Sequence, residues 1–571
     1  MPTELAFICN GESVTMPIED GETLLSVLRE RLGTMSVKDG CAPQGQCGCC
    51  TVFVDGAPRV SCVTPAARVA GRAVTTIEGI DPMRLAPIVD EFVAHGASQC
   101  GFCTPGIVLR CLALVEGERP PTRIEADRAL AAHLCRCTGW NTIFDAIDCA
   151  SRGEKTMSTR DQNGAALQAT IEGRTAQAVG AHVVHGYGGF ADDSAPRDAL
   201  VAVPKPPDSV AVSVVAASME WVVGRSLFEA RAAAGKIQGR RTTVTASPPF
   251  ASPDVPAGQR GVRLATSWNE PGYLEPDASW CVPGGNATPS LGNGGAFGGK
   301  TSSLAAIAAR ELADKYDAPV RVVFSREDVV RLGPKRPPIA AAAWVEDDHV
   351  CIDGRGPLEP VVAASPYVLA TKLTWATESN GRGPIASHSL RAPWAEVAVL
   401  IEGAIDASGI DRRAILDEHG RAVALDLDVC VRSPEDTYVG ARCELAPDGA
   451  IRAVTLRIAC GVRHDDVVAR SYCIGAAHMA IGWVLSEGLA VDPTTGEIHD
   501  LTIRSFGIVR PKHMPMIEIV FLEDPREARN SSDAVFAATA AALWSALARL
   551  DGVRPAQFPA LDTRTSRLIR R

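Results

Sequence analysis

Two tight groups of cysteines are the residues of this chain best suited to chemistry. The first group is Cys41, Cys47, Cys50 and Cys62, separated by five, two and eleven residues. Three of these thiolates are expected on one glycine-rich loop and the fourth on the strand that follows. Four thiolates that converge on two irons are what a [2Fe–2S] cluster needs. Cys49 is a competing ligand, but the Cys-Gly-x-Cys pattern favours Cys50.

The second group consists of two close pairs, Cys100 with Cys103 and Cys135 with Cys137. Both pairs are expected at helix starts, so that they can meet between helices and hold a second cluster. A structural zinc site is the alternative, because four-cysteine zinc sites also use the Cys-x2-Cys spacing. A Cys-x-Cys pair is less usual for zinc, which favours iron and sulfur.

Composition excludes several other classes of protein. The chain has 571 residues, 46% hydrophobic and 22% charged, with a net charge of −10. These values suit a globular chain of about three to five domains. Without a clustered basic face a nucleic-acid partner is not expected. The N-terminus has no export signal, so we expect a cytoplasmic protein in which clustered cysteines bind metal rather than form disulfides.

No membrane span is expected either. The most apolar long stretch, Val535–Leu550, is shorter than the ~20 residues that a span needs. It is interpreted as a buried core helix.

Residues 1–80 are expected to form a small α+β unit. The Asn10-Gly11 pair predicts a hairpin turn, because both turn positions need positive φ. Thr23–Leu32 has helical spacing, and two strands are expected at Thr51–Val54 and Arg59–Cys62. Strands packed around one helix suit a plant-ferredoxin-like module.

Residues 81–155 are expected to form four short helices. Thr104 is the predicted N-cap of one of them, with a proline following at the first helical position. Thr122 and Glu125 form a capping box before the next. Residues 156–180 are polar and weakly patterned, which predicts a linker. The composition then shifts, with possible boundaries near 260 and within 376–389.

Three cysteine motifs carry a family resemblance over residues 1–150. They are Cys-Gly-Cys-Cys-Thr-Val at 47–52, Gln-Cys-Gly-Phe-Cys-Thr-Pro-Gly at 99–106 and Cys-Arg-Cys-Thr-Gly at 135–139. This part of the chain resembles the xanthine oxidase family of molybdenum hydroxylases. The resemblance implies that the helical module holds the cluster nearest the molybdenum cofactor (molybdopterin), and that Gln99 contacts the pterin.

The remainder resembles the molybdenum portion of that family, although it is much shorter. Residues 189–193 and 273–276 match two of its elements, and Gly-Gly-Ala-Phe-Gly-Gly-Lys at 294–300 is similar to its loop beside the metal and pterin. A glycine-dense turn can offer N–H groups to an anionic or polar cofactor. The resemblance implies a substrate-side role for Arg391. It also implies cofactor contacts for Gly294, Gly295, Phe297, Gly298, Gly299 and Lys300.

The implied fold class is α+β multidomain. Its predicted parts are a ferredoxin-like β-grasp domain (1–80), a four-helix [2Fe–2S] domain (81–155), a linker (156–180), a small α/β hammerhead-like domain (181–260) and mixed α/β molybdopterin-binding-like domains (261–380 and 381–571).

Asp533 is the candidate catalytic base, because the resemblance places it where the family has a glutamate. The family reads Gly-Glu-Pro-Pro there, and this chain reads Ser-Asp-Ala-Val at 532–535. Aspartate is one methylene shorter, which reduces its reach by about 1.5 Å. The alternative is an N-cap, because Asp533 stands just before the long alanine-rich stretch.

The resemblance implies a molybdenum-dependent oxidoreductase, acting on an N-heterocycle or an aldehyde and passing electrons through two [2Fe–2S] clusters. An alternative is an iron–sulfur electron-transfer subunit, whose C-terminal part is a non-catalytic scaffold for a separate catalytic chain. A zinc-stabilised binding protein is a third. No credible Gly-x-Gly-x-x-Gly motif is present, so we expect a separate FAD subunit or another electron acceptor as partner, and possibly a homo-oligomer.

Overall fold

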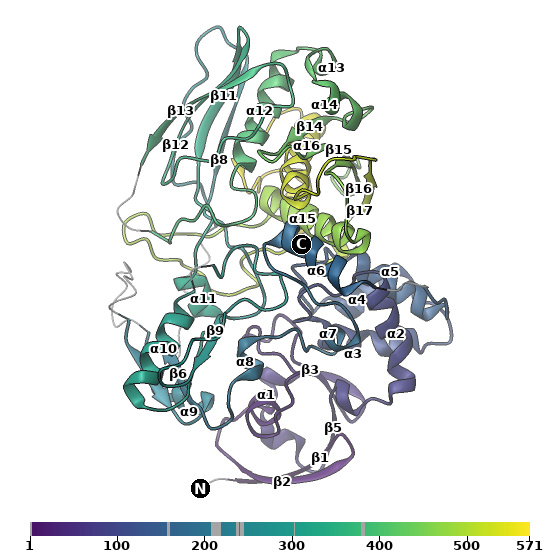
Figure 1. The fold of residues 1–571 in the computed structure, drawn as a ribbon, viewed down its shortest axis with the longest axis vertical. Coiled ribbons are helices and arrows are strands. Elements are labelled where there is room, and N and C mark those ends of the chain that lie inside the picture. Colours follow the sequence, from purple (N-terminus) through teal and green to yellow (C-terminus); the bar gives the residue numbers. More distant parts are fainter. Residues whose placement is uncertain are drawn as a thin grey trace.

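The computed structural model describes residues 3–156, 160–206, 219–235, 239, 245–301, 303–378 and 383–570. Within these residues the strands form four sheets, and the N-terminal module lies at one end of an elongated molecule (Figure 1). The α+β multidomain class predicted from the sequence is confirmed. The boundary predicted at 380 lies outside the described residues.

The N-terminal module is a five-stranded sheet around one short helix, in the order β2-β1-β5-β3-β4. The predicted hairpin turn is present, with φ of 51° at Asn10 and 86° at Gly11. The module has a hydrophobic core of its own. Its elements are β1 (Thr3–Cys9), β2 (Glu12–Ile18), α1 (Leu24–Ser26) continuing as a π-helical turn (Val27–Arg31), β3 (Thr51–Val54), β4 (Ala57–Val60) and β5 (Ala73–Thr75).

Cys62 is placed differently from the prediction. It lies in a 3₁₀ turn, Ser61–Val63, directly after β4 rather than on the strand. The backbone N–H and the hydroxyl of Ser61 both donate to the Cys50 carbonyl, at 3.2 and 2.8 Å. These two bonds draw the turn toward the cysteine loop.

The second module contains the four predicted helices: α2 (Pro82–Ala94), α3 (Thr104–Val115), α4 (Arg123–Leu130) and α5 (Asn141–Ser151). The capping box of Thr122 and Glu125 is confirmed. The predicted N-cap at Thr104 is wrong, since α3 starts at that residue and Cys103 is its N-cap. The Thr104 hydroxyl instead lies 3.0 Å from that of Ser98, which links the helix start to the preceding loop.

The segment 156–180 contains a packed helix, α6 (Gln162–Gly173), where the sequence predicts a linker. Ala165 and Ala169 lie in a small buried cluster with Val468 and Tyr472. The buried stripe of α6 is built from small and polar residues, so the hydrophobic periodicity that reveals a helix is weak. Two short helices follow, α7 (Ala181–Val184) and α8 (Ala191–Ser194).

A four-stranded sheet joins segments that the sequence assigns to separate domains. Its order is β7-β6-β10-β9, so strands from 181–260 pair with strands from 261–380, and the boundary near 260 does not separate two sheets. Hydrophobic patterns locate strands but do not identify their partners. The elements are β6 (Leu200–Pro204), β7 (Trp221–Gly224), α9 (Leu227–Ala234), β9 (Ala278–Cys281), α10 (Leu304–Tyr316), β10 (Val320–Val323) and α11 (Arg326–Leu332).

Two further sheets occupy the other end of the molecule (Figure 1). One has the order β13-β12-β11-β8-β18, and its strands are β8 (Gly261–Thr266), β11 (Ala340–Glu346), β12 (His349–Gly356), β13 (Ala370–Thr377) and β18 (Gln557–Phe558). The other has the order β14-β15-β16-β17, and its strands are β14 (Val429–Arg432), β15 (Tyr438–Leu445), β16 (Ile451–Ala459) and β17 (Met516–Phe521). The helices of this end are α12 (Ala395–Ser408), α13 (Arg412–Ile415), α14 (Glu418–Val423) and α17 (Arg564–Ile569).

Two long apolar helices, α15 (Asp466–Leu485) and α16 (Ser532–Asp551), pack on each other at the centre. Both are long and apolar enough to cross a membrane, but 89% and 78% of their most apolar windows are buried inside the structure. Such burial is typical of core helices, as predicted for Val535–Leu550.

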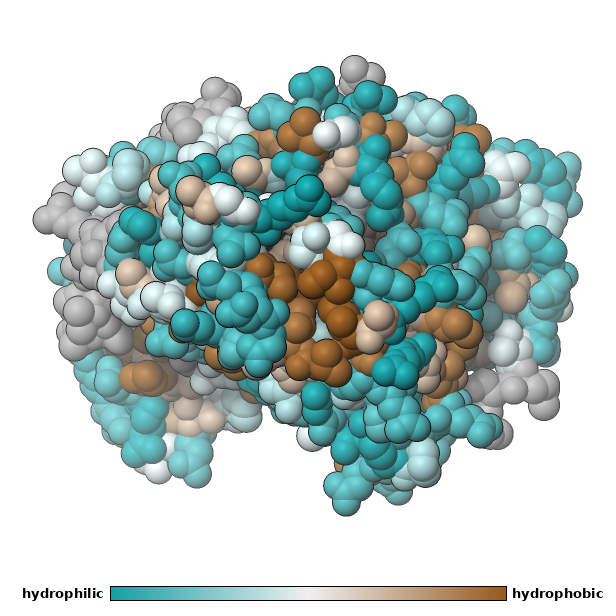
Figure 2. Space-filling view, turned by 90° about the horizontal axis from the view of Figure 1, so that it is seen from above, coloured by the Kyte–Doolittle hydropathy of each residue, from teal (hydrophilic) through white to brown (hydrophobic). Residues whose placement is uncertain are grey.

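Viewed from the end that carries α13, a patch of apolar residues lies within a mostly polar surface (Figure 2).

Candidate iron–sulfur and cofactor site

The four sulfurs of the first cysteine set converge on the loop before β3, and all four residues are buried. The N–H groups of Gln46 and Cys47 both donate to the Cys41 Sγ at 3.3 Å, and the Cys62 N–H donates to the Cys50 Sγ at 3.4 Å. Hydrogen bonds to sulfur of this kind tune iron–sulfur clusters. Hydrogen bonds from the Cys47 and Cys62 thiols also lower the pKa of Cys41.

Cys49 lies beside this set rather than within it. The Cys62 thiol is in hydrogen-bond reach of both Cys41 and Cys50, and Cys41 is in reach of Cys47. The Cys49 thiol has the Cys47 thiol as its cysteine hydrogen-bond partner, and its sulfur is 3.8 Å from the Cys47 carbonyl oxygen. This arrangement favours Cys50 as the ligand.

The second cysteine set also brings its two pairs together. The sulfurs of Cys100 and Cys137 are 3.6 Å apart. The Cys103 thiol is hydrogen-bonded to that of Cys135, and this bond, together with Thr138, lowers the pKa of Cys135 to about 7 against the effect of burial. Thiolates are the form that binds metal. Four converging sulfurs, two from each pair, therefore suit a second cluster.

The two sets lie close together across the contact between the modules. The Leu134 N–H, next to Cys135, donates to the Cys47 carbonyl at 3.0 Å. A Cβ on Gly106 of α3 would lie 2.4 Å from the Gly48 carbonyl, so only glycine permits this approach of α3 to the first loop. The two cysteine sets therefore lie on either side of one close backbone contact between the modules.

The predicted glycine loop contacts the second cysteine set. Gly294, Gly295 and Gly298 have φ of 75°, 81° and 83°, which side chains rarely adopt. A Cβ on Gly295 would lie 2.9 Å from the Cys100 Cβ and 3.0 Å from the Cys137 Sγ. The loop thus lies directly against the sulfurs of this set.

Lys300, predicted to contact the cofactor, has a structural role instead. Its buried ammonium forms an ion pair with Glu275 at 2.8 Å and donates to the carbonyls of Pro276 and Ser290, both at 3.3 Å. An ammonium has three donors, and these partners use all of them. Lys300 therefore anchors the end of the loop.

Polar atoms without partners gather around this loop. Gln99 donates through Nε2 to the Cys137 carbonyl at 2.8 Å and to the Ser471 hydroxyl at 2.9 Å. In the described part of the chain, its Oε1, the Tyr472 hydroxyl and Arg391 Nη1 are buried without a hydrogen-bond partner. Buried polar groups are nearly always bonded. These acceptors and donors fit the polar edge of a pterin.

Asp533 and Arg391, which are 142 positions apart in the chain, come together beside the loop. The Arg391 Nε is 3.7 Å from the Asp533 Oδ1, and its guanidinium lies 5.1 Å from the centre of the Phe297 ring. Burial raises the pKa of Asp533. The N-cap alternative is wrong, since α16 starts at Ser532 and Asp533 lies in its first turn.

The start of α16 is held by Glu172, a residue that the sequence did not indicate. Its buried carboxylate accepts from the Ser531 N–H at 3.0 Å, the Ser531 hydroxyl at 2.6 Å and the Ser532 N–H at 2.8 Å. A carboxylate also interacts favourably with a helix N-terminus. Glu172 lies at the end of α6, so the helix in the predicted linker supports the turn that carries Asp533.

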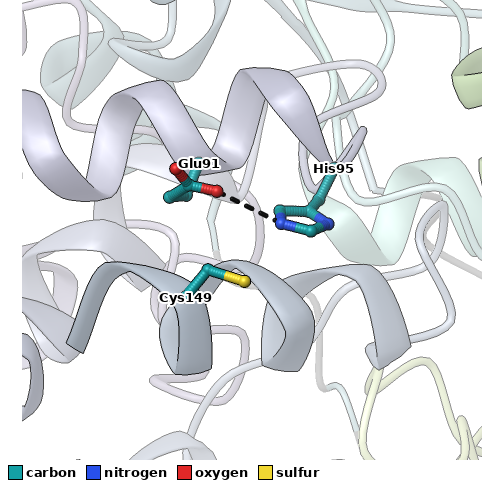
Figure 3. Close-up of side chains that lie close together, drawn as sticks. All are labelled: Glu91, His95 and Cys149. Carbon is teal, nitrogen blue, oxygen red and sulfur yellow. Dashed lines mark ion pairs between the residues drawn. The ribbon is translucent and has the colours of Figure 1, made fainter. Parts of the chain in front are cut away.

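A separate group, Glu91, His95 and Cys149, joins α2 to α5 (Figure 3). The Glu91 Oε2 is 3.2 Å from the His95 Nε2. The N–H and the hydroxyl of Thr156 also donate to the two oxygens of Glu91, at 2.9 and 2.6 Å. These bonds satisfy the carboxylate, and the group ties the end of the helical module to α2.

Comparison with known proteins agrees with this geometry. Residues 7–71 match the family described as 2Fe-2S iron-sulfur cluster binding domain, and residues 76–148 match the [2Fe-2S] binding domain. The chain is 41% identical over 138 residues to the nicotine 6-hydroxylase small subunit of Paenarthrobacter nicotinovorans, covering 24% of this chain and 83% of that subunit. It is 44% identical over 133 residues to the aldehyde oxidoreductase of Megalodesulfovibrio gigas, but this covers 22% of this chain and only 15% of that protein.

The fold extends the likeness over the whole chain. The structure of the aldehyde oxidoreductase from Desulfovibrio gigas superposes with a TM-score of 0.73 at 15% identity, covering 98% of this chain and 99% of that chain. At this identity the match shows a shared fold. The two iron–sulfur domains, their close relatives and this fold lead to one conclusion: the chain belongs to the xanthine oxidase family of molybdenum hydroxylases.

Proposed function

We propose that this chain is a molybdenum-dependent hydroxylase or dehydrogenase of an N-heterocycle or an aldehyde, which sends electrons out through two [2Fe–2S] clusters. One observation carries the proposal: the glycine loop, Arg391 and Asp533 meet beside the second cysteine set. The eight cysteines of the two sets are the proposed cluster ligands. Relatives named as aldehyde oxidoreductase and nicotine 6-hydroxylase support the two substrate classes.

The residues that would hold the molybdenum cofactor are those with unpaired polar atoms. Gln99 Oε1 would accept from the pterin, while Tyr472 and Arg391 would donate to it. When bound, the cofactor supplies oxygen transfer from water and takes up two electrons. Gly295 keeps the loop close enough to the Cys137 sulfur for the electrons to leave toward the second cysteine set.

Asp533 is the proposed base. A base must accept a proton near neutral pH, and burial moves the pKa of this carboxyl toward that range. Arg391 opposes this shift because its positive charge favours the carboxylate. Phe297 lies against the Arg391 guanidinium and so limits where the arginine can move. A separate FAD subunit or another acceptor would take the electrons, as the name "small subunit" of the relatives suggests.

One observation favours the second candidate, an iron–sulfur subunit with a non-catalytic scaffold. The cavity lined by Phe297, Arg391 and Trp483 has a volume of about 40 Å³. Ligand pockets usually measure ~300 Å³ or more. The Tyr472 hydroxyl also lies 2.9 Å from where a Cβ on Gly294 would be, so α15 packs closely against the loop and leaves little open space there.

Metal analysis of the chain, co-expressed with cofactor-assembly proteins, tests the proposal. We expect about four iron atoms per chain and about one molybdenum, with reduction of the clusters on addition of benzaldehyde or nicotinate. The same iron content without molybdenum would establish the second candidate. Zinc in place of iron would overturn both.

A further inference from the structure

A cavity of about 450 Å³ lies where the N-terminal module meets the sheet of β6, β7, β9 and β10. Cys62, a proposed ligand of the first cluster, lines it together with Leu25 and Pro43. Val203 and Phe228 line the opposite side. A molecule in this cavity would touch the residue that holds the first cluster.

The cavity has the composition of a small-molecule site. Such sites usually measure ~300–1,000 Å³ and combine an apolar lining with a few polar groups. Arg231 of α9 also lines it, and pairs with Asp39 of the cysteine loop at 3.0 Å. In the described part of the chain, the buried Nε of Arg231 has no hydrogen-bond partner. The Arg231 side chain as a whole is 30% exposed, so its guanidinium can donate to an acceptor oxygen of a ligand in the cavity.

The charges around the cavity exclude an anionic occupant. Both arginines in the lining already have acidic partners. Arg231 pairs with Asp39, and Arg29 pairs with Asp192 at 2.7 Å and with Asp193 at 2.9 Å. The acidic side chains in the lining outnumber the two arginines; they are Glu30, Asp39, Glu327 and Asp328. A nucleotide, and so a flavin dinucleotide, would bring phosphates without a free cation to meet them. A neutral acceptor avoids this cost.

We propose that this cavity binds a quinone, which accepts electrons from the first cluster. A quinone is flat and apolar, and its carbonyl oxygens can accept from Arg231. Two electrons arrive one at a time from the reduced cluster, and two protons come from water. The two C=O groups become C–OH groups, and two cluster oxidations balance the step. The inference rests on the proposed role of Cys62 as a cluster ligand.

Stopped-flow reoxidation tests this site without substrate turnover. The full chain with its clusters is reduced anaerobically with dithionite, freed of excess reductant and mixed with 2-methyl-1,4-naphthoquinone. We expect the visible absorbance of the oxidised clusters to return at a rate that saturates with quinone concentration. The redox-inert 1,4-dimethoxynaphthalene, similar in shape, should compete.

Two tryptophan variants on α9 provide a matched pair. Ala232 lines the cavity and Ala233 does not, and both are exposed. We expect Ala232→Trp to slow quinone reoxidation at least ten-fold, with Ala233→Trp unchanged. Reoxidation by ferricyanide, a small anion that needs no cavity, should be equal in all three proteins.

The outcomes separate this inference from the proposed function. A rate that rises linearly with quinone, without competition by the inert analogue, overturns the quinone site even if both clusters are present. This comparison needs only the wild-type protein, so it decides the question even where a variant fails to fold. Absence of iron, in contrast, would contradict the cluster assignment itself.

Discussion

At the scale of single residues, Asp533 carries the chemical part of the proposal. Replacing it with asparagine keeps the size of the side chain but removes the base. In molybdenum-loaded enzyme we expect turnover of benzaldehyde or nicotinate to fall about 100-fold or more, the usual contribution of a general base. Iron and molybdenum contents should not change.

The pH dependence gives Asp533 a second readout. Because burial raises its pKa, the rate should fall as pH drops through a value above the ordinary ~3.9 of aspartate. Asp533→Asn should abolish this acidic limb. Asp551→Asn, at the far end of α16, serves as the control. Unchanged turnover of the Asp533→Asn enzyme would exclude the residue as base.

Lys300 and Gln99 show what a motif can and cannot reveal at this scale. Both stand in motifs that the family shares, yet Gln99 reaches the second cysteine set while Lys300 pairs with Glu275. A motif fixes the backbone path and the residue type. It does not say whether an ammonium faces a cofactor or a nearby carboxylate, because that depends on the packing of the loop.

At the scale of elements, the support of α16 by α6 is open to test. Glu172→Ala would leave two N–H groups and the Ser531 hydroxyl at the start of α16 without their acceptor. Buried groups left unsatisfied cost about 1–3 kcal/mol. We expect a lower free energy of unfolding for the C-terminal part, measured by urea denaturation and far-ultraviolet circular dichroism.

The control for Glu172 is Thr170→Ala, since Thr170 is an exposed residue of the same helix that bonds only within it. It should change stability by less than about 0.5 kcal/mol.

Because burial raises the pKa of Glu172, ionising it costs more in the folded than in the unfolded protein. The contribution of Glu172 to the free energy of unfolding therefore decreases as pH rises from the ordinary pKa of a glutamate through its raised pKa in the folded protein. An alanine variant as stable as the wild type would refute the capping role.

Most elements of the first 150 residues can be predicted from the sequence, because their signals are local, although the strand β5 was not among those predicted. The Asn10-Gly11 turn and the Thr122 capping box lie within a few residues of the strands and helices they define. The sheets beyond residue 180 depend on pairings such as Gln557 with Ala265, almost 300 positions apart. No local pattern encodes such a pairing, so the boundary near 260 did not match the sheets.

At the scale of the whole molecule, a buried network of charges joins the N-terminal module to the rest of the chain. Asp192 of α8 pairs with Arg29 at 2.7 Å and with Arg321 of β10 at 2.8 Å. Arg321 also pairs with Glu30 at 2.9 Å. Burial would raise the pKa of Asp192, but the two arginines outweigh it and lower this pKa well below its usual range.

The network predicts how the modules respond to acid. A carboxyl with a lowered pKa stabilises the folded state above its unfolded pKa, ~3.9 for aspartate, and loses this contribution as pH falls through the folded value. Asp192→Asn should reproduce the loss at neutral pH, because Arg29 and Arg321 then keep only Asp193 and Glu30 as their acidic partners. Leaving a buried charge wholly unpaired costs about 3–5 kcal/mol, so we expect a smaller loss here.

Limited trypsin digestion at pH 7.5 measures this prediction. Asp192→Asn should release an N-terminal iron–sulfur fragment faster than the wild type does, while Asp55→Asn should match the wild type. Asp55 pairs with Arg72 within the first module, and their side chains are 49% and 41% exposed. Exposed pairs contribute little to stability, so this control changes a charge without changing the contact between the N-terminal module and the rest of the chain. Equal digestion of all three proteins would mean that apolar packing, rather than this network, holds the modules together.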